Sequence, residues 1–130
     1  MVRMKPDAML VSLKNLFVPV LRERGLKGSF PHFRRLKDDQ IDLLTIQFDR
    51  HGGGFVIEIS KCPPDGVTTT CGKQIPPNKV TAWDMNNRHR LGAPVGGDHW
   101  FRFDDGTPTD QVANSAVSHL EEADVWWSRK

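Results

Sequence analysis

The sequence predicts a single α+β domain, spanning residues 1–130, in which helices from both ends of the chain accompany an antiparallel sheet. Three observations lead to this fold class. Apolar residues recur at helical spacing near both termini. In the middle of the chain they alternate with a period of two, which is typical of strands. A run of glycines separates two such alternating segments, as in a hairpin, and a length of 130 residues suits one domain.

The first expected element is a helix that begins near Pro6 and ends at Gly25. Pro19 lies inside its apolar pattern, where it removes one backbone N–H and crowds the preceding turn. We therefore expect a proline-kinked helix, or two pieces that meet near Val18. The apolar stripe of this helix consists of Leu10, Leu13, Leu16, Phe17, Val20 and Leu21.

The centre of the sheet is expected from residues 40–50 and 55–62, joined by the glycine-rich residues 51–54. Their side chains alternate between two faces, so the segments should pair as antiparallel strands. Further strands are expected at 28–36, with Pro31 at an edge or bulge, at 79–83 and at 99–103. Together these make a sheet of about four to five strands. The inward positions of the central pair are Leu44, Ile46, Phe48, Phe55, Ile57 and Ile59.

The remaining segments are a loop and a last helix. Residues 63–78 contain four prolines and two glycines, which favours a long loop excursion over core structure. The last helix follows the turn at 104–109 and packs on one face of the sheet. Its apolar stripe consists of Val112, Ala116, Leu120, Ala123 and Trp127.

Basic residues are unevenly distributed along the chain. Residues 1–37 hold nine lysines and arginines but only two acidic residues, although the whole chain carries a formal charge of only +2. Such a segment suits either the solvated faces of a helix and a strand, which we favour, or contact with an acidic partner or phosphate backbone. Trp83 and Trp100 would offer stacking platforms for nucleic acid, but the small net charge argues against that partner.

Size and cysteine usage indicate a cytoplasmic protein. No run approaches the length of a membrane span, and the basic N-terminal segment lacks the pattern of a signal peptide. Cys62 and Cys71 lie nine positions apart and do not have the spacing of zinc-finger ligands. We expect both thiols to be reduced, although a disulfide between them is geometrically possible.

No motif in the sequence predicts catalysis, a metal or a cofactor. Asp49 and the segment Glu58–Lys61 resemble the acidic and lysine positions of metal-dependent nucleases. Strand alternation, however, directs Glu58 and Lys61 to opposite faces. The histidines and cysteines have no ligand spacing, and the hydroxyl-rich residues 68–71 have no neighbouring base. We expect no catalytic residue, no metal ligand and no cofactor.

The order of motifs resembles that of a bacterial family of uncharacterised small proteins, the domain of unknown function DUF4304. Similarity extends from about residue 10 to residue 127, with Leu26 standing where family members usually have phenylalanine. The resemblance implies the fold and a bacterial origin but transfers no activity. The matching positions are Gly25, Phe33, Gln47, Phe55, Arg90, Leu91, Gly92, Asp98 and Trp100.

The polar segment 88–103 is the candidate site. Arg90 and Asp98 are expected to form a bidentate salt bridge across the intervening loop while Trp100 packs below. As a structural feature this pair needs no ligand, which is the reading we favour. As a functional feature, the segment would form a cationic, aromatic-lined recess for an acidic peptide or phosphate. The candidate binding residues are Arg88, Arg90, Asp98, His99 and Trp100.

We therefore expect a non-enzymatic binding or accessory domain. It would recognise another protein, or a second copy of itself, through one sheet face or the 88–103 loop. An immunity or regulatory role is one form of this hypothesis, offered by analogy with other small domains. The alternative is an enzyme or binding protein that acts on a phosphate-bearing or nucleic-acid ligand through Arg90, His99, Glu58 and Asp98.

Overall fold

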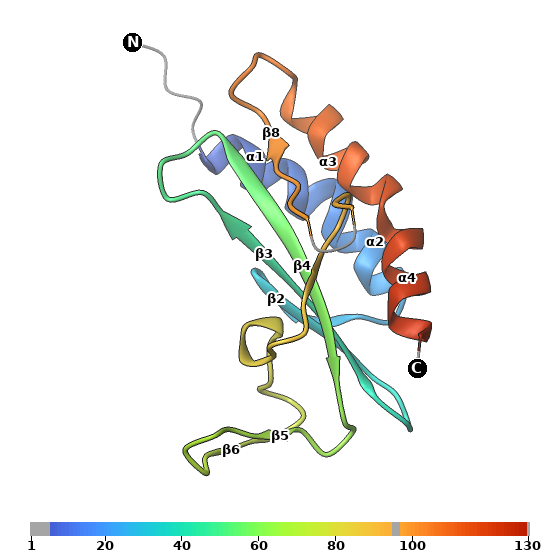
Figure 1. The fold of residues 1–130 in the computed structure, drawn as a ribbon. Coiled ribbons are helices and arrows are strands. Elements are labelled where there is room, and N and C mark those ends of the chain that lie inside the picture. The colour runs from blue at the N-terminus through green and yellow to red at the C-terminus, as the bar shows by residue number, and fades with distance from the viewer. Residues whose placement is uncertain (1–5, 95–96, 130) are drawn as a thin grey trace.

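A computed structural model, which describes residues 6–94 and 97–129, places helices from both ends of the chain on one face of an antiparallel sheet (Figure 1). The α+β fold is confirmed, with six strands in the main sheet rather than four or five. Among the described residues, no helix combines the length and apolar character needed to cross a membrane. The strands of the main sheet are β1 (Lys27–Ser29), β2 (His32–Leu36), β3 (Ile41–Phe48), β4 (Gly54–Cys62), β7 (His89–Arg90) and β8 (Phe101–Arg102).

The N-terminal helix is irregular just before Pro19. α1 (Pro6–Ser12) runs into a π-helical turn, η1 (Leu13–Phe17), and α2 (Val18–Glu23) follows. The N–H of Val18 donates to the carbonyl of Leu13, one residue farther back than in an α-helix. Pro19 thereby occupies the first turn of α2, where its missing N–H leaves no hydrogen bond unmade. The break expected near Val18 is thus present, as a π-helical turn.

Residues 28–36 form a turn and parts of two strands rather than one strand. β1 and β2 pair antiparallel as a tight hairpin, and Pro31 lies in the turn between them. The Phe30–Pro31 peptide bond is cis. The position of Pro31 agrees with its inability to donate a hydrogen bond within a sheet.

The central hairpin of β3 and β4 pairs as expected. Leu44 lies opposite Ile59 and Ile46 lies opposite Ile57, and these four side chains are buried beneath the helices. α3 (Thr109–Ser118) and α4 (Leu120–Ser128) complete this helix-covered core, with the predicted apolar stripe of the last helix buried. The second face of the hairpin carries a smaller buried cluster, which consists of Ile41, Leu43, Cys62, Val80 and Ala82.

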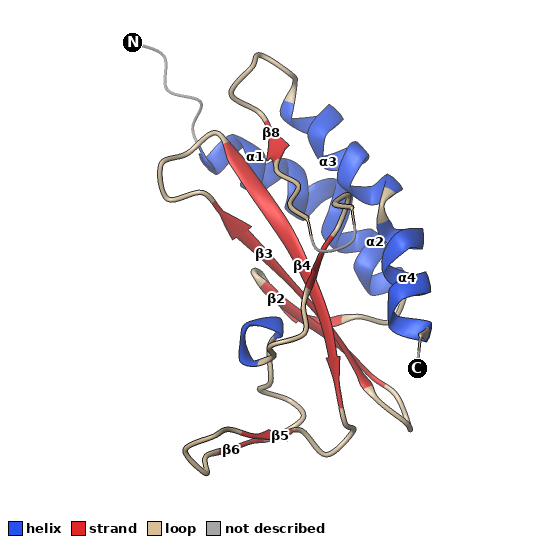
Figure 2. Ribbon diagram, viewed as in Figure 1, coloured by secondary structure: helices blue, strands red, loops and turns tan. Residues whose placement is uncertain are grey.

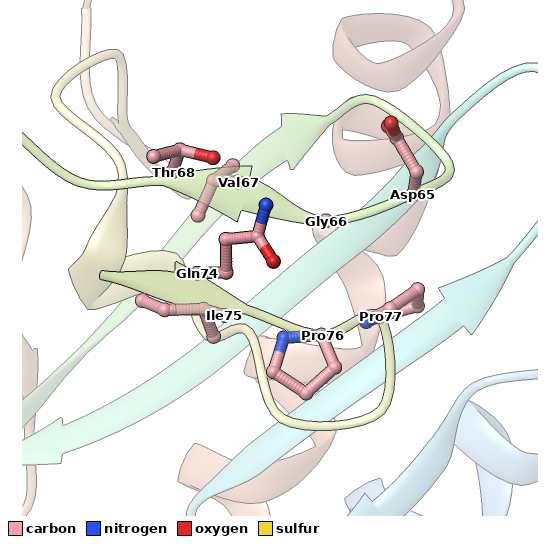
Figure 3. Close-up of a pocket in the computed structure, with 8 residues that line it drawn as sticks. All are labelled: Asp65, Gly66, Val67, Thr68, Gln74, Ile75, Pro76 and Pro77. Atoms are coloured by element: carbon pink, nitrogen blue, oxygen red, sulfur yellow. The ribbon is translucent and has the colours of Figure 1, made fainter. Parts of the chain in front are cut away.

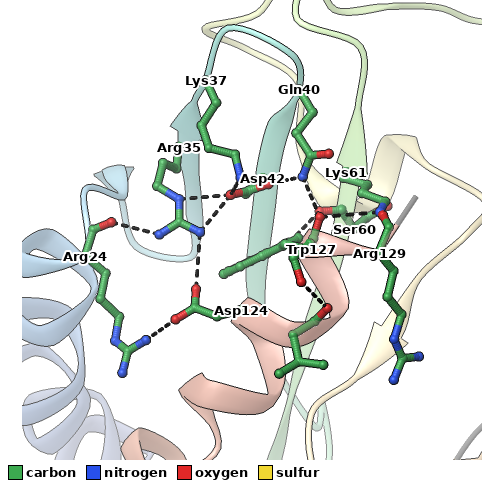
Figure 4. Close-up of polar contacts among 12 residues, drawn as sticks. Arg24, Arg35, Lys37, Gln40, Asp42, Ser60, Lys61, Asp124, Trp127 and Arg129 are labelled. Carbon is green, nitrogen blue, oxygen red and sulfur yellow. Dashed lines mark hydrogen bonds and ion pairs between the residues drawn. The ribbon is translucent and has the colours of Figure 1, made fainter.

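A polar network attaches α4 to the β2–β3 hairpin (Figure 4). The fully buried carboxylate of Asp42 contacts Arg35 and Lys37, and Arg35 also reaches Asp124 in α4. At the end of α4, the carbonyl of Trp127 accepts a hydrogen bond from Gln40 at 2.8 Å. Polar groups thereby satisfy carbonyls that the helix end leaves without a helical partner.

Residues 63–78 leave the body of the domain and carry a short hairpin, β5 (Val67–Thr68) and β6 (Gln74–Ile75), which projects away from the main sheet (Figures 1 and 2). A groove of about 550 Å³ lies along this hairpin, lined mainly by its two strands and flanking prolines (Figure 3). The chain then returns through the 3₁₀ turn η2 (Ala82–Asp84), not through the strand expected at 79–83. Thr81 and Asp84 form a capping box there, which favours a helical turn.

Both cysteines are free thiols that differ in accessibility. Burial, with smaller contributions from Asp65 and Asp84, raises the pKa of Cys62 to about 11. Cys71 is exposed, and the hydroxyl of Thr69 lowers its pKa. We expect a thiol reagent at neutral pH to modify Cys71 alone in the folded protein and both residues after denaturation, because the thiolate is the reactive form. Titration of thiol equivalents checks this; a folded protein with no reactive thiol would indicate a disulfide instead.

Candidate functional site

The candidate segment 88–103 forms one edge of the sheet in two pieces. β7 pairs with β4 at Arg90 and Glu58, and β8 pairs with β4 at Arg102 and Gly54. β3 pairs along the whole other edge of β4, so β7 and β8 lie along the same remaining edge, one after the other. Residues 95 and 96, in the loop between them, lie outside the described residues.

Strand alternation sorts the side chains of this edge onto two faces. His89, Leu91 and Phe101 point toward the helices, where Leu91 and Phe101 join the core and Phe101 stacks on Phe55. The cross-strand partners Glu58 and Arg90 lie on the opposite face, as does Arg102. The expected alternation of the segment is therefore present.

The opposite face carries a single row of side chains, Arg88, Arg90, Trp100 and Arg102, which we call the Arg–Trp row. Continuing each register by one or two residues places Arg88 beside Ser60 and Trp100 beside Val56. Successive members of the row then lie about 7 Å apart, the repeat of one face of a strand. Val56 is fully buried, which agrees with Trp100 packing beside it on the same face. The loop has brought residues 88–90 and 100–102 into one continuous row.

The centre of the row is a stack of two guanidinium groups on one indole. The Cζ atoms of Arg90 and Arg102 lie 5.5 Å and 5.7 Å from the centre of the Trp100 ring. Such contacts hold the arginine side chains in place and leave their N–H groups available. Gly54 gives Arg102 its position, because a Cβ there would lie 3.3 Å from the Arg102 side chain.

Asp98 fixes this stack from one side. Its Oδ1 accepts from Arg90 Nη1 at 2.5 Å, and its Oδ2 accepts from Trp100 Nε1 at 3.1 Å. The hydrogen bond from Arg90 is the main cause that lowers the pKa of Asp98. The expected Arg90–Asp98 salt bridge therefore forms. It is not bidentate, because Trp100 engages the second carboxylate oxygen.

The outer arginines are less fully engaged. Arg88 lies 3.5 Å from the buried carboxylate of Glu58, and Arg102 lies 3.9 Å from Asp104. Neither guanidinium group makes a hydrogen bond to any of the described residues. Both side chains are more than a third exposed, at 37% and 48%. The row therefore offers unused N–H donors to a ligand.

His99 does not belong to this surface. Its ring packs edge-on against Phe101 at 4.8 Å and lies 5.8 Å from His119, on the helix-covered side. It also packs closely on Gly92, since a Cβ at Gly92 would lie 2.5 Å from its ring. The structure thus brings together Arg88, Arg90, Asp98 and Trp100 but separates His99 from them. The enzyme hypothesis needed four residues together. His99 lies on the helix-covered side, whereas the other three, Arg90, Glu58 and Asp98, lie on the side of the row.

Glu122, at the start of α4, anchors the candidate segment to the helices. Its carboxylate binds His89 Nε2 at 2.7 Å and accepts from the N–H of Gly92, and it lies 3.5 Å from His119. These contacts attach β7 and the beginning of the loop to α4 on the helix-covered side of the sheet. Sequence reasoning missed this residue, because the contact joins positions about thirty residues apart and no local pattern marks it.

The contacts of Glu122 predict a pH dependence. Burial alone would raise the pKa of Glu122, but hydrogen bonds from His89 and Gly92 hold it below the ordinary value of 4.5. A carboxyl with a lowered folded-state pKa stabilises the fold above its unfolded pKa, and this contribution is lost as the pH falls through the folded-state value. We therefore expect wild type to be more stable than Glu122→Gln at neutral pH, with the difference shrinking once the pH falls below about 4.3, the unfolded-state pKa of a glutamate. Urea unfolding at several pH values measures it; a constant difference would contradict the assignment.

A second polar set lies on the same face as the row. His32 Nδ1 is 2.9 Å from the hydroxyl of Thr45, and Thr45 pairs across the strands with Glu58. Burial, followed by the charge of Arg34, lowers the pKa of His32, which favours a neutral ring. Thr45 is fully buried, and the ring of half-buried His32 packs against Trp83 in a T-shaped contact with ring centroids 4.8 Å apart, so both side chains have partners within the domain. Trp83 itself is 47% exposed and extends the aromatic character of this face.

Several basic residues near the N-terminus are engaged within the domain, while Arg3 and Lys5 lie outside the described residues. Arg24 contacts Asp124, while Arg35 and Lys37 contact Asp42. Arg34 donates to the carbonyl of Val80. These contacts favour a structural role for the basic segment over an extended anionic binding track. Within residues 6–94 and 97–129, no three histidine, cysteine or acidic side chains are arranged to hold a metal ion.

Comparison with known proteins identifies a family but no activity. The family model described as "Domain of unknown function (DUF4304)" matches residues 17–130. No curated protein and no solved structure matches the chain significantly. The family expected from the sequence is therefore confirmed, and the function has to be argued from the surface described above.

Proposed function

The chain belongs to the DUF4304 family, and we propose that it is a non-enzymatic domain that binds another protein through the Arg–Trp row. One observation carries this proposal. Two separate pieces of chain converge on β4 so that three arginines and a tryptophan form one ordered row on the face opposite the helices.

The chemistry of the row suits a protein interface. Tryptophan and arginine are the residues that most often dominate binding energy in such interfaces. Asp98 and the stacking on Trp100 already hold Arg90 in a defined position, so binding would sacrifice less side-chain freedom. The exposed Trp83 adds apolar area on the same face.

Catalysis and nucleic-acid binding have less support. Among the strand residues that the structure describes on this face, His32 supplies the one imidazole, and it is bonded to the buried hydroxyl of Thr45. The ring of His99 packs on the helix-covered side, against Phe101 and near His119. Single-stranded nucleic acid is usually held in a positive groove that follows several phosphates. Here Arg34, Arg35 and Lys37 are engaged internally. A cytoplasmic location and an immunity or regulatory role remain predictions from the sequence.

Site-specific photo-crosslinking in the cells that produce the protein tests the proposal. Gln47 is exposed and lies opposite Val56, so a crosslinking side chain at position 47 reaches out beside the row. Val125, which is 55% exposed on α4, provides the control position on the helical side. We expect one protein to be captured from position 47 and lost when Arg102→Ala is added. Capture of the same proteins from both positions, or none from position 47, would contradict the proposal; capture of a second copy would indicate self-association.

A further inference from the structure

We propose, on the premise of the protein-binding function above, that the partner contributes an extended segment with acidic side chains at alternate positions. The proposal rests on the spacing within the Arg–Trp row. Its members follow the pleat of one strand edge, so their side chains repeat at about 7 Å. An extended polypeptide repeats the side chains of each face at the same interval, whereas a helix does not.

The hydrogen-bond donors of the row favour acidic side chains in that segment. A guanidinium group carries five N–H donors and can bind a carboxylate with two of them. Arg90 uses one donor on Asp98, and the guanidinium groups of Arg88 and Arg102 form no hydrogen bond with the described residues. These three groups are between 30% and 48% exposed, so their remaining donors are accessible to a partner.

The acidic residues already on this face do not remove that complementarity. Glu58 is buried beneath the row, with only 7% of its side chain exposed. Asp98 accepts hydrogen bonds from Arg90, from Trp100 and from the backbone of His99, so its oxygens are occupied within the domain. Asp98 is nevertheless 56% exposed, and Asp104, which is 50% exposed, lies 3.9 Å from Arg102. A partner carboxylate would therefore share this face with two acidic side chains but would still meet the unsatisfied donors of Arg88 and Arg102.

The order of the row predicts the order of side chains in the partner. Arginine, arginine, tryptophan and arginine follow one another along β4. The best segment would have acidic residues at its first, third and seventh positions and an apolar residue at its fifth, opposite Trp100. A segment that runs in the opposite direction would need the mirror order, with acidic residues at its first, fifth and seventh positions and the apolar residue at its third, so the pattern also fixes the direction of the segment.

Fluorescence anisotropy with three labelled probes tests this pattern. The matched peptide carries aspartate at the first, third and seventh positions, leucine at the fifth and serine elsewhere. The shuffled peptide has the same composition with the three aspartates adjacent, and an oligothymidylate represents nucleic acid. We expect the matched peptide to bind about tenfold more tightly than the shuffled one, since each aligned pair contributes a fraction of a kcal/mol.

Two charge-matched variants locate the effect. Arg102→Gln should remove most of the preference for the matched peptide. Lys14→Gln, at an exposed position on the helical side, should leave it unchanged. Equal affinity for both peptides would overturn the alternate-position pattern while leaving an acidic binding surface in place. Failure to bind either peptide would overturn the acidic segment, whereas the protein-binding function itself fails only if position 47 also captures no protein. Tighter binding of the oligothymidylate would overturn both proposals and identify the surface as a nucleic-acid site.

Discussion

Replacing Trp127 by alanine is expected to lower the free energy of unfolding by about 4 kcal/mol. Trp127 is 1% exposed and belongs to the core between α4 and the sheet. Its Nε1 donates to the carbonyl of Ser60 at 2.8 Å, and Arg35 Cζ lies 5.1 Å from its ring. The substitution therefore creates a large cavity and leaves a buried carbonyl without its donor, and both effects destabilise the fold.

The neighbouring Trp126 provides a matched control for this prediction. Trp126 is half-buried and lies against His89 and Lys61 at the surface of the same helix. Trp126→Ala removes the same number of atoms but should cost less than half as much, because solvent fills the vacated space. Denaturant unfolding followed by circular dichroism compares the two variants. Similar losses for both would mean that α4 is held by general packing rather than by Trp127.

The helical core and the central hairpin could be predicted because the apolar pattern that specifies each element lies within one continuous segment of the sequence. Leu44, Ile46, Ile57 and Ile59 alternate along the chain, and the register of a two-stranded hairpin follows from that alternation and its turn. The stripe that ends at Trp127 similarly has one consistent helical face. These predictions agree with the structure because each helix or strand buries the face on which its apolar residues lie.

The Arg–Trp row was only partly predictable, because it depends on where a loop ends. The sequence marks Arg88, Arg90, Asp98, His99 and Trp100 as one candidate group, although strand alternation already places His99 and Trp100 on opposite faces. No pattern reveals that the loop returns the chain to the same edge of β4, which makes Arg102 the fourth member of the row. Contacts such as Glu122 with His89 join distant segments and have no sequence period. The groups that complete the surface were therefore missed.

The second large effect is expected at Asp42, whose side chain has no solvent exposure. Its carboxylate lies 2.7 Å from Arg35 Nη2 and 3.2 Å from Lys37 Nζ, and it accepts from Gln40 Nε2 at 2.6 Å. Asp42→Ala leaves Arg35 without its buried counter-charge, and removing one partner of a buried ion pair typically costs about 3–5 kcal/mol. Asp39→Ala, at an exposed position in the adjoining turn, should cost almost nothing.

Asp42→Asn separates the charge of this residue from its shape. The amide keeps one oxygen as an acceptor for Arg35 or Gln40 but loses the negative charge, so its stability should lie between those of wild type and Asp42→Ala. Equal stability of wild type and Asp42→Asn would show that hydrogen bonds alone account for the network. Asp42 pairs with Lys61 on the helix-covered face, whereas the Arg–Trp row lies on the other side. A folded Asp42→Asn protein should therefore be less stable yet keep the full preference for the matched acidic peptide, because the geometry of the row depends on β4, Asp98 and the returning loop.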